Sequence, residues 1–569
     1  MRRALRTAAV LAAAAVLFVI LFSFLALPRG AVRLEPQGPW ADLARRTVAG
    51  GYHVHTTRSD GAAGKPAIAA AAAGAGLQFV IFTDHGDATR PPDPPVYIEG
   101  VLCLDGVEIS TADGHYVAID MPQAPYPLGG TARAVAEDVA RLGGFGIAAH
   151  PDSPKPELRW TDAAVPVDGF EWLNTDSEWR AASRGATARA ALGYLVRPAA
   201  ALASLLHRPV ASLQRWDAMT RGRPVVGLAG LDAHGGIGRQ ADDGSRSNMP
   251  GVPRYRDSFR TFSDRVILDR PLSGDAQADA RALYGSIRAG RVFTTIDVLA
   301  APGLVSFDVD GPSGRAEMGG TLVAGSRGTI RADALVPRGA TLVLVRDGQD
   351  LDPRIAAATA PSDGVLSLRV PVASGEGSYR AEVRLASAPG EPPLPWLVSN
   401  PIYFLRPAAP RPPPPVVAGE PIAGSSWHIE KDPGSSAILR TRDGRVEVEF
   451  ALRSGDRANQ FVAAATPLAP ERRLTSIAFD AKASRPMRIS VQLRFDRLPG
   501  APRWGESVYV DQRSAPATVH AADLRPMQAG ESAVPDTALA AALLCVVELT
   551  NTPPGRRGIF ELSNVRVAR

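Results

Sequence analysis

An α/β barrel followed by two β-sandwich domains, with one transmembrane helix ahead of them, is the fold class that the sequence predicts. Short apolar runs alternate with helical stretches between about residues 50 and 295, as in βα units. Short strands separated by Gly- and Pro-rich turns follow from about residue 302, and an uncharged apolar run occupies residues 7–27. The 569 residues exceed the roughly 250 to 300 residues that one hydrophobic core supports, so several domains are expected.

The overall composition is that of an ordinary globular protein. Hydrophobic residues make up 45% of the chain and charged residues 21%, which excludes wholesale disorder. The formal net charge of +5 is spread among acidic residues and forms no basic stripe. We therefore expect no nucleic-acid partner.

The N-terminal segment has the features of a membrane anchor. Arg2, Arg3 and Arg6 precede an apolar run that is about as long as the ~20 residues needed to cross a bilayer. A cleaved signal peptide normally has a shorter run followed by small residues, so an uncleaved anchor is favoured and secretion after cleavage is the alternative. The three arginines predict a cytoplasmic N-terminus, with the body anchored to the inner membrane on the periplasmic or extracytoplasmic side.

The whole chain is expected to divide into five segments. The RPAAPRPPPPVVAG run cannot pack as regular structure and predicts an extended linker, and alternating apolar and polar residues after it predict strands. For the last segment a galactose-binding-like fold is one interpretation. The expected boundaries are 1–35 for the anchor or signal segment, 36–300 for the barrel, 301–406 for an immunoglobulin-like β-sandwich, 407–418 for the linker and 419–569 for the C-terminal β-sandwich.

A helical region and the two cysteines also carry structural information. An Ala- and Leu-rich helical region at about 185–216 is interrupted by Pro198 and Pro209, and it is expected to cover a site, face the membrane or simply pack. Cys103 and Cys545 lie in apolar, strand-like runs, so buried free thiols are predicted.

Six of the nine histidines lie at the ends of apolar runs in the predicted barrel, in the contexts YHVHTTRSDG, IFTDHGD, ADGHYVAI, IAAHPD and LAGLDAHGG. Because a strand alternates its side chains between two faces, His53 and His55 are expected to point the same way, as are Asp232 and His234. Side chains at the carboxyl ends of barrel strands converge on one mouth.

A mixed set of imidazoles and carboxylates suits a hydrolytic metal centre. Neutral imidazole binds Zn, Mn or Fe, and a carboxylate can bridge two ions, so two or three divalent cations (Mn, Zn or Fe) are predicted. Close cations generate a hydroxide from a shared water near neutral pH, so hydrolysis needs no protein nucleophile. Asp84, beside His85, is either a partner that fixes an imidazole or an outward-facing carboxylate.

With these motifs in this order, the segment from about Gly51 to Thr295 resembles the PHP (polymerase and histidinol phosphatase) superfamily. The HxHxxxSDG, TDH, Glu followed by GH, HP and DxH blocks all occur in family order. The resemblance implies a distorted (β/α)7 barrel. The anchor and the β-module with WLVSNPIYF look more like the CehA/McbA group of that superfamily, which includes carbamate-ester hydrolases.

The resemblance also implies how the ligands are shared. One metal would be held by His53, His55, Glu108 and Asp232, a second by Glu108, His115 and His150, and a third by Asp60, His85 and His234. Catalysis would depend on the bridging Glu108 together with Asp232 and His150. Asp60 departs from the histidine that the histidine-rich phosphatases often carry.

The expected function is a hydrolase that uses a metal-bridging hydroxide on a phosphoester, or on a carbamate or carboxyl ester, of a small molecule or a polymer. The alternative is an envelope-exposed glycan-binding protein with a catalytically inactive barrel, because two β-sandwiches are appended. Trp427, Trp504 and Tyr509 are candidates for stacking on a sugar, although core packing is the favoured interpretation. Glycan contact by the C-terminal domain therefore stays open.

Overall fold

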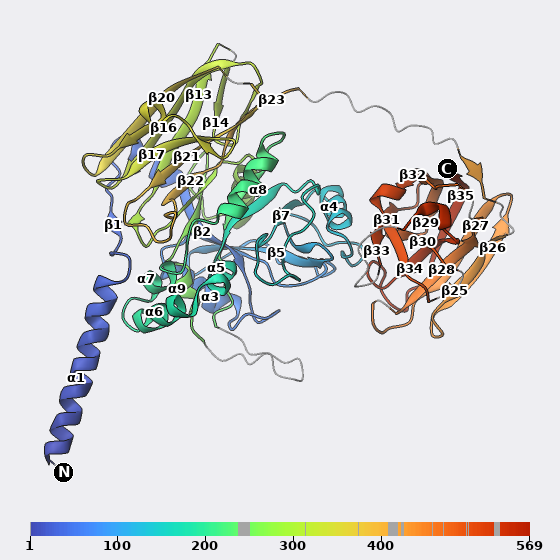
Figure 1. The fold of residues 1–569 in the computed structure, drawn as a ribbon, viewed down its shortest axis with the longest axis horizontal. Coiled ribbons are helices and arrows are strands. Elements are labelled where there is room, and N and C mark those ends of the chain that lie inside the picture. The colour runs from blue at the N-terminus through green and yellow to red at the C-terminus, as the bar shows by residue number, and fades with distance from the viewer. Residues whose placement is uncertain are drawn as a thin grey trace. The chain divides into compact units, whose positions relative to one another are not determined.

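The computed structural model describes residues 2–236, 251–312, 314–373, 375–407, 419–422, 426–457, 459–469, 472–496, 498, 500–527 and 535–569. They form two compact units (Figure 1). Unit 1 comprises Met1–Gly86, Pro92–Pro122 and Val139–Ala408, and unit 2 comprises Asp87–Pro91, Gln123–Asp138 and Ala409–Arg569. The predicted linker at 407–418 lies outside the described residues except for residue 407.

Unit 1 begins with one long apolar helix, α1 (Arg2–Leu25), whose stretch Leu5–Leu25 is long and apolar enough to cross a membrane. Only a small share of it is buried, and in Figure 1 it stands apart from the other elements of unit 1 over most of its length. The predicted apolar helix is therefore confirmed. A helix of this length and composition near the N-terminus occurs in membrane anchors and in signal sequences.

The strands of the α/β region pair in the order β10, β2, β3, β5, β6, β7, β8, β9. Beyond β9, the N–H groups of Leu231 and Ala233 donate to the carbonyls of Tyr52 and His53, which joins the end of β9 to β2. The described strands thus close on themselves. Their bounds are β2 (Thr47–Val54), β3 (Phe79–Phe82), β5 (Val101–Thr111), β6 (Gly114–Ile119), β7 (Phe145–Ala148), β8 (Gly169–Asn174), β9 (Val226–Gly230), β10 (Ser263–Ile267) and β11 (Val292–Thr295).

The regular alternation of strand and helix breaks at β6. This strand is antiparallel to both β5 and β7, whereas β2, β3 and β5 pair in parallel, as do β7, β8 and β9. Only residues 112–113 separate β5 from β6, and a parallel crossover needs a dozen or more residues, so the two strands form a hairpin. The hairpin brings Glu108 and His115 onto neighbouring strands.

Helices surround these strands, and the apolar core lies between the two layers. The predicted helix before Gly290 is α10, which starts after the N-cap Asp275, buries Leu283 and Ile287 and ends before Gly290 at φ 68°. The other helices of this region are α2 (Pro39–Arg46), α3 (Lys65–Ala73), α5 (Thr175–Ala181), α6 (Arg184–Tyr194), α7 (Pro198–Ala203), α8 (Val210–Thr220) and α9 (Tyr255–Ser258), with α10 at Ala276–Arg288, whereas α4 (Ala132–Arg141) belongs mostly to unit 2.

The residues predicted to form the first β-sandwich do form two sheets, and one of them is continuous with the barrel strands. Strand β22 pairs with β11, so the two sheets of strands share hydrogen bonds. Asn400 Nδ2 donates to the carbonyls of Gly227 and Val292, and the Tyr403 hydroxyl donates to that of Val225. Main strands of this module are β13 (Leu304–Gly311), β14 (Gly314–Glu317), β15 (Thr321–Val323), β16 (Arg327–Val336), β17 (Thr341–Arg346), β20 (Gly364–Ala373), β21 (Gly377–Arg384), β22 (Leu397–Ser399) and β23 (Ile402–Leu405).

Unit 2 contains a second β-sandwich, built from two facing antiparallel sheets. Trp427, Trp504 and Cys545 lie in its core, so both tryptophans are packing residues and the prediction of buried free thiols is confirmed for Cys103 and Cys545. Within this unit Arg488 of β30 is buried and donates to Asp138. Its main strands are β25 (His428–Lys431), β26 (Ser436–Arg442), β27 (Arg445–Ala451), β28 (Phe461–Pro467), β29 (Ser476–Ala483), β30 (Met487–Arg494), β31 (Arg503–Val510), β32 (Ala515–His520), β34 (Ala542–Glu548) and β35 (Gly558–Ala568).

A buried ionic network joins the segment between α7 and α8 of unit 1, which carries Arg208, to the β-module. Glu382 of β21 is fully buried and accepts hydrogen bonds from Arg208 at 2.8 and 2.9 Å, from Arg380 and from Arg384. Burial raises the pKa of Glu382, but the arginines outweigh this effect and hold it well below its usual value. A buried carboxylate satisfied on both oxygens is costly to lose, because the arginines would remain buried.

Glu382→Gln should destabilise unit 1 by about 3 kcal/mol, since removing one partner of a buried ion pair leaves uncompensated charge. Amide hydrogen exchange of β17 and β21 in the full chain measures this change. Because the pKa of Glu382 is lowered in the folded state, its stabilisation is present at neutral pH and is lost as the pH falls below the unfolded value. Asp350→Asn, at the exposed edge of the network, is the control and should change exchange far less. Equal exchange in both variants would contradict the prediction.

Candidate metal centre

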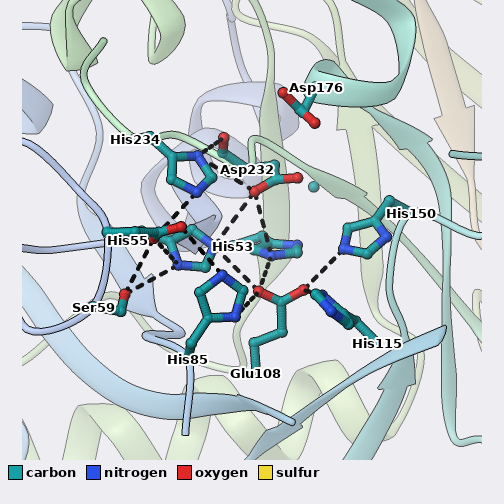
Figure 2. A network of polar contacts seen from close by, with 12 residues as sticks. His53, His55, Ser59, His85, Glu108, His115, His150, Asp176, Asp232 and His234 are labelled. Carbon is teal, nitrogen blue, oxygen red and sulfur yellow. Dashed lines mark hydrogen bonds and ion pairs between the residues drawn. The ribbon is translucent and has the colours of Figure 1, made fainter. Parts of the chain in front are cut away.

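All nine residues that the sequence singled out as metal ligands lie in one cluster at the ends of the strands of unit 1. Figure 2 shows Glu108 of β5 among imidazoles from neighbouring strands, with Asp232 opposite. Four overlapping groups place one ligand atom from each member within 4.8 Å of the others. The groups are His53, His55 and Glu108; His53, His150 and Asp232; His85, Glu108 and His115; and His55, Asp60, His85 and His234. Their role as ligands remains a prediction.

Three of these residues have a left-handed backbone. His53 has φ 63°, His150 has φ 27° and Asp232 has φ 46°, values that non-glycine residues seldom adopt. The β2–β3 register shifts between Tyr52 and Val54, so His53 lies at an irregularity of the strand. The convergence of His53 and His55 therefore depends on this irregularity and not on simple strand alternation. Such strained backbone is concentrated at functional sites.

At the deepest point, four ligand atoms face one another. His53 Nε2 and His55 Nε2 each lie 3.3 Å from Glu108 Oε2, and they lie 3.6 and 3.4 Å from Asp232 Oδ1. Both histidines are completely buried, and both Nε2 atoms lack a hydrogen-bond partner among the described residues. Leaving such nitrogens without a partner is costly unless a ligand satisfies them.

These separations fit a shared cation. Ligand atoms at 2.0–2.2 Å from a tetrahedral ion lie about 3.4 Å from one another, which is close to the distances between these four atoms. Imidazole nitrogen and carboxylate oxygen are the donors that Zn, Mn and Fe accept. The residues present therefore fit a divalent cation held by His53, His55, Glu108 and Asp232.

Glu108 extends the cluster with its second oxygen. Its Oε1 lies 2.7 Å from His115 Nδ1 and 2.8 Å from His150 Nε2, while Oε2 faces His53, His55 and His85. One buried carboxylate thus faces two sets of imidazoles. This is the arrangement expected of a carboxylate that bridges two cations.

Asp60 organises the outer side of the cluster. Its Oδ1 lies 3.3 Å from His55 Nδ1 and 3.3 Å from His234 Nε2, and its Oδ2 lies 3.3 Å from His85 Nε2. His85 is about one-third exposed and is the most open of the imidazoles. The group of ligands around Asp60 is therefore the one nearest to solvent.

The charges in the cluster shift the pKa values of its side chains. Burial lowers the pKa of His150 and His234, but the neighbouring carboxylates Glu108 and Asp60 outweigh it and raise both values to about 9. Burial and the adjacent His234 lower the pKa of His55 to about 4. Nearby histidines hold the pKa of Glu108 well below its usual range although burial opposes this. The carboxylates are therefore ionised at neutral pH.

Glu171 of β8 supports the cluster from behind, and the sequence motifs did not reveal it. Its Oε1 lies 2.6 Å from His53 Nδ1, and its Oε2 accepts from the backbone N–H of His150 at 2.6 Å and from Asn174 Nδ2 at 2.9 Å. The carboxylate fixes the His53 ring so that Nε2 faces the other ligands. A glutamate in the buried run GFEWLN was the available signal, because an ionised residue in a buried strand needs partners.

Other residues hold the loops that carry the ligands. Tyr255 Oη lies 2.8 Å from the carbonyl of His55 and 2.9 Å from that of His234, which fixes two ligand loops to one side chain. Gly230 is required beside Glu171, because a Cβ there would lie 2.5 Å from Glu171 Oε1.

Asp84 has a different role from the imidazole partner considered above. Its oxygens accept from Thr56 N, Thr56 Oγ1 and Ser59 Oγ at 2.7, 2.8 and 2.7 Å. It fixes the turn after His55. Asp176 at the start of α5 points toward the cluster in Figure 2 and is paired with Arg180.

Comparison with known proteins gives weak likenesses. No family model matches the chain, and no curated protein matches it. A two-domain protein containing a predicted PHP-like metal-dependent phosphoesterase from Bacteroides vulgatus aligns with 64% of this chain and 98% of its own, at 15% identity and a TM-score of 0.30. The family 11 carbohydrate-binding module of the cellulosomal cellulase Lic26A-Cel5E of Clostridium thermocellum aligns with 27% of this chain and 95% of its own, at 12% identity and a TM-score of 0.22. Function is therefore inferred from the geometry of the cluster itself.

Glu171→Gln should weaken metal binding about 10- to 100-fold. The neutral amide fixes the His53 ring less well, and its NH2 group cannot accept the hydrogen bond that the backbone N–H of His150 donates to Glu171. Metal titration of the purified full chain measures the affinity. Glu178→Gln, which removes a buried carboxylate that contacts His207 instead, is the matched control and should bind metal like the wild type. Equal loss in both variants would assign the effect to general destabilisation.

Metal uptake near about pH 7.5 should release protons, since His150 and His234 have pKa values of about 9 and must lose a proton to become ligands. The affinity for the metal should accordingly rise with pH up to about pH 9, where both histidines lose their proton. Calorimetric titration in two buffers with different ionisation enthalpies counts the protons released. An identical heat in both buffers would contradict the prediction.

Proposed function

We propose that the chain is a metal-dependent hydrolase of the PHP type, anchored by α1 and acting on a phosphoester or on a carbamate or carboxyl ester. The observation that carries the proposal is the convergence of the buried, unpartnered Nε2 atoms of His53 and His55 on the oxygens of Glu108 and Asp232. Buried imidazole nitrogens that lack a hydrogen-bond partner and face carboxylates support a metal site, because a bound cation would satisfy them.

The bound cations would supply an activated water and neutralise the negative charge that develops on the substrate oxygens. The chain's own residues hold this arrangement in place. Glu108 keeps two sets of imidazoles together, Glu171 orients His53, and the left-handed backbone at Asp232 turns its carboxylate toward them. The proposal includes two or three divalent cations, which are Mn, Zn or Fe.

The motif order from Gly51 to Thr295 supports the superfamily assignment, and the anchor with its adjoining β-module supports the CehA/McbA layout. Because α1 is apolar and largely exposed, it requires a bilayer or another apolar environment around it. Because Arg2, Arg3 and Arg6 precede the apolar run, the proposal places the body on the extracytoplasmic face of the inner membrane.

The charge at the cluster's mouth bears on the choice of substrate. Arg180 is about two-fifths exposed, contacts Asp176 and feels the charge of Asp232. A guanidinium there suits an anionic group on the substrate. Phosphoesters are therefore the first substrates to examine, with carbamate and carboxyl esters beside them.

Two of the three aromatic residues considered for glycan contact are not available to a sugar, whereas the third, Tyr509, is half-buried, so the glycan-binding alternative stays open. Trp427 and Trp504 are buried in its core, so they offer no face to a sugar. The barrel retains every predicted ligand side chain in one cluster, whereas an inactive barrel would tolerate the loss of some.

His53→Ala/Asp232→Ala should lose bound metal and hydrolysis together, with the fold retained, because both residues face the shared cation position. Elemental analysis of the full chain purified without chelator, followed by assays with phosphoesters and carbamates, measures both. Arg369→Ala, on the exposed face of the β-module, is the control and should behave like the wild type. Turnover that survives in the double variant would refute the hydrolase proposal.

A further inference from the structure

Helices α6 and α7 of unit 1 pack against the residues at the C-terminal end of α1. Leu27, just after the apolar stretch, is buried against Ala200 and Ala201 of α7, and Tyr194 packs on the same cluster. A Cβ on Gly193 would lie 2.5 Å from Leu27 Cδ1, so the Leu27 side chain would have to shift if Gly193 were replaced. The junction between α1 and the body is therefore a packed contact.

Arg197, between α6 and α7, fixes the same junction by polar contacts. Its guanidinium donates to the carbonyl of Ser23 at 3.1 Å and to that of Pro28 at 2.6 Å, and it lies 5.2 Å from the centre of the Phe24 ring. The last carbonyls of a helix have no partner within the helix, so this arginine caps α1. Figure 1 shows α6 and α7 beside the end of α1.

The segment 184–203, here called the α6–α7 elbow, exposes an apolar side chain near the C-terminal end of α1. Leu195, at the end of α6, is 78% exposed, although Gly193 two residues earlier contacts Leu27. An exposed leucine immediately beside the end of a bilayer-length helix is positioned to enter the boundary of the bilayer.

The same elbow carries charge of one sign. It contains Arg184, Arg189 and Arg197 and no acidic residue. Arg189 also lines a cavity of 330 Å³ together with the α1 end at Ala26 and Pro28 and with Ser204. Guanidinium and hydroxyl groups at the end of a membrane span suit the phosphate of a lipid headgroup.

We propose that the α6–α7 elbow is a second membrane contact, in which Leu195 enters the bilayer boundary and Arg184 and Arg189 bind anionic lipid headgroups. The inference rests on the proposed anchoring of α1. With α1 capped by Arg197 and the elbow on the same membrane, unit 1 has a fixed orientation relative to the bilayer. The region that the sequence left open as a cover for the site, a membrane contact or a packing helix is thereby assigned to the membrane.

Fluorescence quenching in lipid nanodiscs tests this placement. The full chain is reconstituted with phosphatidylglycerol and labelled at Leu195→Cys with an environment-sensitive probe. Cys103 and Cys545 are both buried, and labelled wild type gives the background. Brominated lipids are expected to quench the probe at position 195 by about twofold or more, as for a side chain in the interfacial layer.

Two further positions separate the possible outcomes. Leu17→Cys within α1 should be quenched strongly. Val365→Cys should not be quenched, because Val365 is exposed and belongs to β20, a strand that lies far from α1 in Figure 1. Quenching at 17 without quenching at 195 would overturn the elbow contact and leave the anchor standing. An unquenched probe at 17 would overturn both. Hydrolysis is assayed separately, so an inactive chain with a quenched elbow would refute only the hydrolase.

The headgroup preference is tested by charge reversal. Arg184→Glu/Arg189→Glu alters only exposed residues and should bring quenching at position 195 down toward the Val365→Cys level in phosphatidylglycerol. Replacing that lipid by phosphatidylcholine should act in the same direction. Unchanged quenching in both experiments would overturn the anionic headgroup as the ligand.

Discussion

The burial of many ionisable groups at one point is the constraint on which unit 1 depends. His53, His55 and Glu108 have at most 1% of their surface exposed, and Glu171 has none. Charges taken out of water are costly unless opposite charges and hydrogen bonds compensate them. The carboxylates and imidazoles provide part of this compensation for one another, and the unpartnered Nε2 atoms leave a position that a cation would satisfy.

The scaffold around the cluster explains why the β-module is part of the same compact unit. Asn400 and Tyr403 contact the beginning of β9, and the chain beyond β9 carries Asp232 and His234. Behind the cluster, Glu171 is fixed by Asn174 and by the backbone of His150. Residues far from the ligands in sequence therefore determine where the ligand side chains lie, which is the usual requirement for a metal site.

Much of the site was predictable because its residues occur at the ends of apolar runs. Parallel strands bring their carboxyl ends together, so residues such as His53, His85 and Asp232 could be expected to meet, whereas Asp60 and His115 were expected only through the resemblance of the motif order. Glu171 and Tyr255 could not be identified in the same way, because a lone glutamate in a strand and a lone tyrosine at the start of a short helix have no spacing that reports their contacts. The antiparallel β6 was also missed as a break in the barrel pattern, although the short connection after Thr111 requires a hairpin.

The sequence by itself determined the classes of element, the apolar N-terminal helix, the β-sandwiches and the composition of the ligand set, since periodicity and residue chemistry are local properties. Tertiary structure alone decided how these parts are used. It placed His53 at a strand irregularity with φ 63°, gave Glu108 two sets of histidines, and set the end of α1 against Arg197. Each of these depends on pairs of atoms separated by many residues, and local sequence patterns carry no information on such pairings.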